Sequence, residues 1–254
     1  MNGFMKKAAA IGCGAALAAT LAGCSSGEPN TIEPKTNDPI DSATPVAEEA
    51  PEKAETIISE SGWSLSKNEY DESQMWVNYA LILANTDKSN MTVNQTIKIT
   101  VKDANGSVIA SETAYATFVG PGDVMPVVGR TDMLSSEPAD VIIELGTGQQ
   151  EPASYDEMYR VTDFSVSGAV ENPTSDGDTN WAGEFTNPSD KPMDKGVTPT
   201  VVLFNGGQIV GGFNNNLMFD AVAGGTTASF EIDPFGSPVP EHDSFEVYIV
   251  PNIF

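Results

Sequence analysis

Residues 96–106 read TIKITVKDANG, and apolar and polar side chains alternate strictly in this stretch up to the turn. Ile97, Ile99 and Val101 therefore share one face of an extended strand, because successive side chains of a strand point to opposite faces. The strand gives way to Asp-Ala-Asn-Gly at 103–106, residue types that tolerate the positive φ angles of a hairpin turn. The stretch predicts a half-buried antiparallel strand that ends in a hairpin.

The same alternation continues on both sides of this stretch. Two further sets of apolar residues mark an earlier and a later strand: Val77, Tyr79, Leu81 and Leu83, then Val141, Ile143 and Leu145. Turn-forming clusters such as Gly120-Pro121-Gly122-Asp123 lie between the strands. Long helical periodicity is absent from Ile57 onward, so the pattern predicts an all-β fold.

The second half of the chain repeats the scheme of the first half. The corresponding segments are 76–83 and 181–186, 85–89 and 187–191, 105–106 and 205–207, and 120–122 and 223–225. Two copies of about a hundred residues with short strands and Gly/Pro turns predict two tandem immunoglobulin-like β-sandwiches. The domain boundaries that we expect are a signal peptide at 1–23, a tether at 24–57, sandwiches at 58–147 and 159–254, and a linker at 148–158.

The N-terminal segment has the order of features that is typical of a secretory signal. Lys6 and Lys7 precede an apolar run over 8–21, which is too short to span a bilayer. The run ends in the motif Leu21-Ala22-Gly23-Cys24. This motif resembles the cleavage and lipidation site of prokaryotic lipoproteins. The resemblance implies cleavage before Cys24 and acylation of its thiol, which anchors the chain to a membrane. An ordinary signal peptide cut near Ala22 is the alternative.

Cysteine usage follows from this motif. The chain has two cysteines; Cys13 would leave with the signal peptide and Cys24 would carry lipid. The mature chain would then have no disulfide and no free thiol, so core packing alone would stabilise its domains.

Residues 25–57 are rich in proline and in acidic side chains. Such a composition cannot bury enough apolar surface to fold, so we expect a disordered acidic tether. The whole chain has a formal net charge of −24, and loss of Lys6 and Lys7 makes it more negative. Nucleic-acid binding is excluded by this balance, because it depends on clustered Lys and Arg.

Several strand and turn segments resemble one family. They are 78–88, 99–106, 120–123, 183–191 and 230–232, which together are similar to the FxLyD-type immunoglobulin-like domains of bacterial lipoproteins. The stretch VVLFN at 201–205 departs from the naming motif, because it lacks the terminal Asp. The resemblance implies an immunoglobulin-like fold and an envelope location, and it implies no catalytic residue.

Reactive side chains are scarce. His242 is the only histidine, and its Pro-Glu-His-Asp context favours a polar turn over a catalytic base. No pair of carboxylates stands out as the two acids of a glycosidase. We therefore predict no enzyme activity and no cofactor.

Two segments are candidate binding sites. Asp176, Asp178 and Asn180 present oxygen ligands at alternate positions, as in the first part of a calcium loop. Trp181 stands where that loop needs glycine, so a solvated loop is the favoured interpretation. The polar run Asn214, Asn215 and Asn216 after Phe213 is a candidate recognition loop, with a plain hairpin connection as the alternative. Trp63, Trp76 and Trp181 offer surfaces for sugars, but their placement favours packing.

These observations predict a lipid-anchored, outward-facing protein of the cell membrane, in a Gram-positive envelope rather than a periplasm. We expect a non-catalytic module that binds an envelope protein or a wall polymer. Two alternatives stay open. A solute-binding lipoprotein that feeds a transporter would need two α/β lobes, and a structural spacer would need no partner site.

Overall fold

The computed structural model of the chain describes residues 55–68, 71–153, 160–173, 179–215 and 221–252. They all belong to one compact unit, Pro51–Phe254. The motif Leu21-Ala22-Gly23-Cys24, nearly all of the expected tether, and Asp176, Asp178 and Asn216 lie outside the described residues.

The predicted all-β fold is confirmed, since the described residues form antiparallel strands and a short 3-10 helix, η2 (Val161–Asp163). The strands of the first half are β1 (Thr56–Lys67), β2 (Met75–Asn85), β3 (Asn90–Lys102), β4 (Val108–Val119), β5 (Val124–Arg130), β6 (Asp140–Leu145) and β7 (Gln149–Pro152). Those of the second half are β8 (Ser165–Pro173), β9 (Thr179–Thr186), β10 (Val197–Asn205), β11 (Gln208–Asn214), β12 (Thr227–Ile232) and β13 (Ser244–Pro251).

Each half is a sandwich of two sheets. In the first half the strand orders are β1-β2-β5 and β4-β3-β6, and β7 also pairs with β3. In the second half they are β8-β9-β12 and β11-β10-β13. The two halves therefore have the same connectivity, with β8 in the place of β1 and β10 in the place of β3, which agrees with the predicted duplication.

A buried asparagine occurs at the same place in each half. Asn85 donates through Nδ2 to the carbonyl oxygen of Val119 at 3.2 Å, and Asn187 donates to that of Val222 at 2.9 Å. Both side chains are at most 3% exposed. The Asn85 amide thus joins the end of β2 to the end of β4, and the Asn187 amide joins the segment after β9 to the segment after β11. Both satisfy carbonyl groups that would otherwise be buried without a partner.

These asparagines correct one detail of the predicted repeat. Counting back from Asn85 and Asn187, Trp181 corresponds to Tyr79 and not to Trp76. Tyr79 and Trp181 are both essentially buried, at 1% and 0% exposure. Trp76 lies nearer the start of β2, where the Arg130 guanidinium lies 5.1 Å from its ring centre in a cation–π contact.

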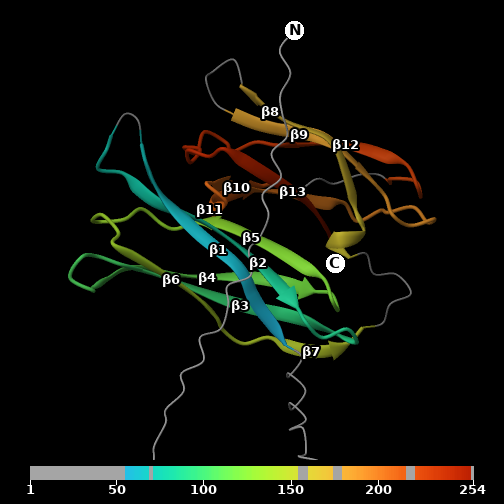
Figure 1. Cartoon of the computed structure of the whole chain (residues 1–254), viewed down its shortest axis with the longest axis horizontal. Helices are drawn as coiled ribbons and strands as arrows, with labels where there is room; N and C mark the ends of the chain where they lie inside the picture. The colour runs from blue at the N-terminus through green and yellow to red at the C-terminus, as the bar shows by residue number, and fades with distance from the viewer. Residues whose placement is uncertain (1–54, 69–70, 154–159, 174–178, 216–220, 253–254) are drawn as a thin grey trace, which may run out of the picture. The chain divides into compact units, whose positions relative to one another are not determined.

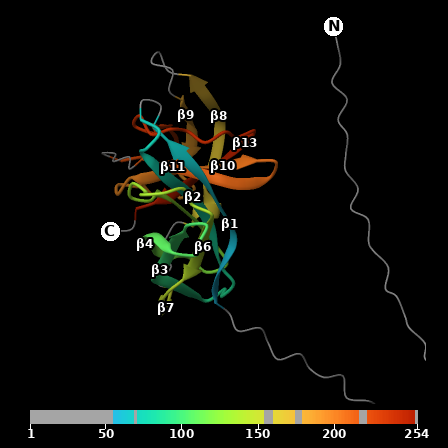
Figure 2. The same ribbon diagram turned by 90° about the vertical axis from the view of Figure 1, so that its left-hand side faces the viewer.

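The two sandwiches stack face to face, so that the four sheets form four layers (Figure 1 and Figure 2). Each sandwich has its own core, one around Tyr79 and Ile99 and one around Trp181 and Leu203. A third cluster lies between them and contains Ala80, Ile82, Val202 and Ile209. The central strands β2 and β10 are consequently buried on both of their faces.

Unlike faces meet at this contact. The first half presents the sheet β1-β2-β5, whereas the second half presents β11-β10-β13, whose counterpart in the first half is β4-β3-β6. Gly62 and Gly212 allow the backbones to approach. A Cβ atom at Gly62 would overlap the carbonyl oxygen of Ile209, and one at Gly212 would come within 2.6 Å of Val128.

The ends of the sandwiches differ from the expected linker and tether. Strand β7 lies inside the expected linker and pairs with β3, and β1 already begins at Thr56. Asp123, which is 1% exposed, accepts hydrogen bonds from the backbone N–H groups of Val161 at 2.8 Å and Thr162 at 3.1 Å. The turn at 120–123 therefore fastens the start of the second half to the first half.

Candidate functional site

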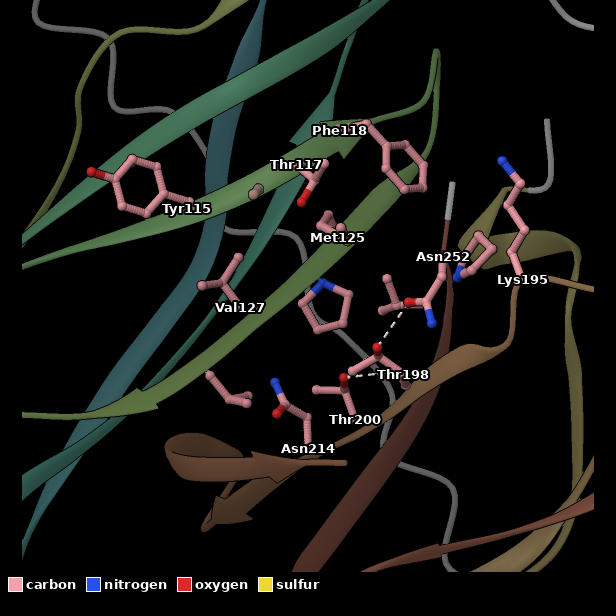
Figure 3. A pocket seen from close by; sticks show the side chains of 15 residues that line it. Tyr115, Thr117, Phe118, Met125, Val127, Lys195, Thr198, Thr200, Asn214 and Asn252 are labelled. Carbon is pink, nitrogen blue, oxygen red and sulfur yellow. Dashed lines mark hydrogen bonds between the residues drawn. The ribbon is translucent and has the colours of Figure 1, made fainter. Parts of the chain in front are cut away.

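A groove of about 560 Å³ runs between the two halves beside β4 and β5, and we call it the Tyr115 groove. One wall consists of Tyr115–Phe118 of β4 and Met125–Val128 of β5. The other wall comes from the second half and includes Thr198, Thr200 and Asn214 (Figure 3). This volume lies within the range of ligand sites in proteins.

The walls arise from the topology of the sandwich. β4 and β5 follow one another in the chain but end different sheets, so an open side of the first sandwich lies between them. The stacked second half supplies β10 and β11, in which Thr200 and Asn214 are directly paired across the strands. The layer contact therefore sets the width of the groove.

The lining combines an apolar floor with neutral polar groups and one cation, Lys195. Tyr115 is 67% exposed, while Met125, Val127 and Val250 are nearly buried. On the opposite wall, the Thr198 hydroxyl donates to Asn252 Oδ1 at 3.1 Å, as Figure 3 shows. None of the lining residues is acidic, although the chain contains 36 Asp and Glu residues. The groove is thus an acid-free area of an acidic protein, and its polar groups suit a ligand that is not strongly cationic.

A second cavity of about 620 Å³ lies on the other open side of the first sandwich. It is lined by residues 60–63 of β1, by Val141 and Ile143 of β6, and by residues 207–209 at the start of β11. Trp63 forms part of its wall, but Glu60 also lines it, and β6 carries Glu144 nearby. The Tyr115 groove is the stronger candidate because its lining lacks these carboxylates.

His242 lies elsewhere, in the second sandwich. Its Nδ1 lies 2.8 Å from the Pro240 carbonyl oxygen, and its Nε2 lies 3.1 Å from Glu171 Oε2. Its side chain is 8% exposed, and its ring centre lies 6.1 Å from that of Trp181. Both ring nitrogens are engaged in contacts that fasten the loop before β13 to β8, which agrees with the predicted turn and leaves no nitrogen directed at a substrate.

The structure separates the members of the predicted recognition loop. Phe213 stacks on Trp181 with ring centres 5.6 Å apart, so it belongs to the core of the second sandwich. Asn215 accepts a hydrogen bond from the Asp233 backbone N–H at 3.0 Å. Asn214 alone, among the described members, lines the Tyr115 groove.

Of the calcium candidates, only Asn180 is described. Its side-chain nitrogen donates to Glu231 on the neighbouring strand β12. The described residues contain no group of three His, Cys, Asp or Glu side chains placed to hold a metal ion. The calcium loop stays a prediction, because Asp176 and Asp178 lie outside the described residues.

Glu112 of β4 is a half-buried acid beside Tyr79. The Tyr79 hydroxyl donates to Glu112 Oε1 at 3.0 Å, whereas Glu112 Oε2 is buried without a partner. Burial raises the pKa of Glu112, and the nearby Asp132 carboxylate raises it further. Burial, followed by the charge of Glu112, also raises the pKa of Tyr79 well above its usual value. Neither Tyr79 nor Glu112 lines the groove.

Sequence reasoning did not single out Tyr115 or the layer contact. A signal for the contact exists in the run Tyr79–Ala84, which is apolar throughout instead of alternating, as is usual for a strand buried on both faces. A signal for the groove exists in Ala114–Val119, a stretch with no charge and no proline.

Comparisons with known proteins give no family. No protein-family model matches the chain, and no curated protein matches it. Among solved structures, red sea bream transglutaminase is similar at 16% identity over 70% of this chain, with a TM-score of 0.20. The chain spans only 27% of that enzyme. The tandem CBM22 domain of Xyn10C from Paenibacillus barcinonensis is similar at 10% identity over 78% of this chain and 86% of its own, with a TM-score of 0.14.

The described part of the chain contains no helix that is long and apolar enough to cross a membrane.

Proposed function

We propose that this chain is a lipid-anchored protein of the cell envelope. It binds an envelope protein or a wall polymer in the Tyr115 groove and catalyses no reaction. The groove is the observation that carries the binding role. It combines an exposed aromatic ring, an apolar floor and neutral hydrogen-bonding groups, which is the composition of many recognition sites. The motif Leu21-Ala22-Gly23-Cys24 supports the anchored, outward-facing location.

The state of the one histidine supports a non-catalytic role. A histidine base needs a ring nitrogen directed at the proton that it removes, and both nitrogens of His242 contact groups of this chain. The predicted immunoglobulin-like fold is also compatible with the FxLyD-type lipoprotein domains that the sequence resembles.

The anchor is tested by substituting Cys24→Ala and measuring how the full chain divides between membrane and soluble fractions. We expect the parent chain in the membrane fraction and the variant in the soluble fraction. A variant that stays with the membrane to the same extent would contradict the anchor.

The binding role is tested by cross-linking intact cells and purifying the anchored chain from solubilised envelope. The matched control is a chain with the same anchor and tether but without residues 58–254. We expect a protein or a wall polymer that is recovered with the full chain and not with the control. Equal recovery with both chains would contradict a binding role and would favour a spacer.

A further inference from the structure

One segment of the Tyr115 groove is an unprotected strand edge. β4 pairs only with β3 among the described strands, so its other backbone edge is open. Along the groove this edge is formed by Ala114–Val119, which contains Tyr, Thr, Phe and Val and no charged residue or proline. A short, uncharged stretch of high β propensity on an open edge is a template for pairing with another strand.

Other edge strands of the protein carry features that discourage such pairing. These features are Pro126 in β5, Glu144 in β6, Glu231 in β12 and the irregular register between Ser167 and Val170 in β8. Charges, prolines and bulges are the usual means of protecting an edge. Ala114–Val119 has no charged residue and no proline, although β4 carries Glu112 before this segment. The edge strand β11 also lacks charge and proline, but its pairing with β10 is irregular between Leu203 and Phe204.

The direction of the β4 side chains determines what an added strand would meet. Ala116 and Phe118 are buried and point into the sandwich, whereas Tyr115 and Thr117 are exposed. A strand beside β4 would continue the sheet, so every second side chain would enter the groove against Met125 and other floor residues. The remaining side chains would lie on the other face of the sheet, beside Tyr115 and Thr117, which also line the groove.

Charge limits the chemistry of the added strand further. The chain has a net charge of −24 and therefore repels a strongly acidic segment at long range. The groove has no carboxylate in its lining, and its one charged lining residue is Lys195 of the second half. The matching strand is apolar at the alternate positions that enter the groove and has no net negative charge.

We propose that the open edge of β4 at Ala114–Val119 binds an extended polypeptide segment as an additional strand, with alternate apolar side chains in the Tyr115 groove. This inference rests on the proposed binding role and specifies its partner as a polypeptide. Strand addition supplies affinity through main-chain hydrogen bonds and specificity through the alternate side chains.

The test uses a labelled probe peptide in which threonine and valine alternate between terminal lysines. Binding to the full chain is measured by fluorescence anisotropy, and amide exchange within Ala114–Val119 is measured in parallel. The edge variant combines Tyr115→Lys with Thr117→Lys, both at exposed positions. The matched control combines Thr227→Lys with Ser229→Lys, at alternate exposed positions of the edge strand β12.

We expect the probe to bind, to slow exchange in Ala114–Val119 and to lose about tenfold or more in affinity for the edge variant only. A version of the probe with N-methylated backbone should not bind, because it keeps the side chains but lacks the N–H donors. Equal binding of the two probe versions, or unchanged exchange in Ala114–Val119, would overturn strand addition.

Two other occupants are distinguishable. A soluble N-acetylglucosamine oligosaccharide that binds, and is weakened by the edge variant, would replace the polypeptide with a glycan. Concentration-dependent dimerisation without the probe, abolished in the edge variant, would replace it with a second copy of this chain. If the edge variant still recovers the cross-linked partner from cells, the binding role stands and the β4 proposal fails.

Discussion

Gly62→Ala is the most direct test of the stacked arrangement. Gly62 lies in β1 opposite Ile209 of the second half, and its φ angle is not in the left-handed region. Alanine therefore fits the backbone conformation at this position. Its methyl carbon would overlap the Ile209 carbonyl oxygen and lie within 3.0 Å of the Ile209 Cβ. Since backbone atoms cannot rotate away, the strands of the two halves would have to separate.

The cost follows from what the contact buries. Ile82 and Ile209 are 7% and 5% exposed, and Val202 is fully buried. Fully burying one such side chain stabilises a protein by about 1.5–3 kcal/mol. Overpacking of a close contact typically costs about 1–3 kcal/mol. We expect a loss of about 2–3 kcal/mol, since the strands separate locally while most of the layer stays in place. For a protein of this size that corresponds to a fall in Tm of about 4–12 °C.

The assay is thermal and urea unfolding followed by circular dichroism, with Gly120→Ala as the matched control. Gly120 also has an ordinary φ angle, but a Cβ atom there would lie 3.4 Å from Asp123, an ordinary contact distance. We expect the control to unfold at nearly the same temperature and urea concentration as the parent. Gly62→Ala should unfold at a lower temperature and urea concentration, with a less cooperative transition between the two halves. Identical unfolding of the two variants would refute the close packing of β1 against β11.

Three other variants test individual contacts by urea unfolding. Asp123→Asn removes a buried carboxylate that accepts hydrogen bonds from two backbone N–H groups of η2, and we expect a loss of about 2 kcal/mol, against little change for the exposed Asp194→Asn. Asn187→Ala leaves buried carbonyl groups without a donor, and we expect a loss of about 2–3 kcal/mol; a loss below that of an exposed Asn105→Ala would contradict this role. Glu112→Gln should stabilise the protein at pH 7. Because burial raises the pKa of Glu112, its protonated form stabilises the fold at low pH, and that contribution is lost as the pH rises through the folded-state pKa. The gain in free energy of unfolding of Glu112→Gln over the parent should therefore shrink on acidification. A constant gain between pH 4 and 7 would argue against a raised pKa.

Local sequence patterns predicted the strands and their duplication because both depend on side-chain alternation and turn chemistry. The strand around Ile97–Val101 and the turn that ends at Gly106 occur as expected, with Gly106 at a φ of 81°. The layer contact depends on long-range shape, in particular on which glycine meets which backbone. No local pattern reveals that Gly62 and Ile209 approach each other.

The candidate site could be predicted less well, for a related reason. A polar Asn-rich segment stands out in the sequence, yet Phe213 lies in the core and Asn215 bonds within its own sandwich. The groove instead requires two edge strands of one half and the wall of the other half. Its composition is visible in Ala114–Val119, but its shape exists only after the halves stack.

The two sandwiches join through different sheets, so the same contact could in geometric terms be repeated at either end of the stack. A contact between two different surfaces does not close on itself. The outer sheet β4-β3-β6 corresponds to the inner sheet β11-β10-β13, and the outer sheet β8-β9-β12 corresponds to the inner sheet β1-β2-β5. Linear arrays of repeats stay soluble only when their terminal faces are polar. Here Lys98 and Glu144 on one outer sheet, and Glu184 and Glu231 on the other, are exposed and occupy that capping role. These charges therefore oppose the stacking of a further copy of either sheet on the outer faces.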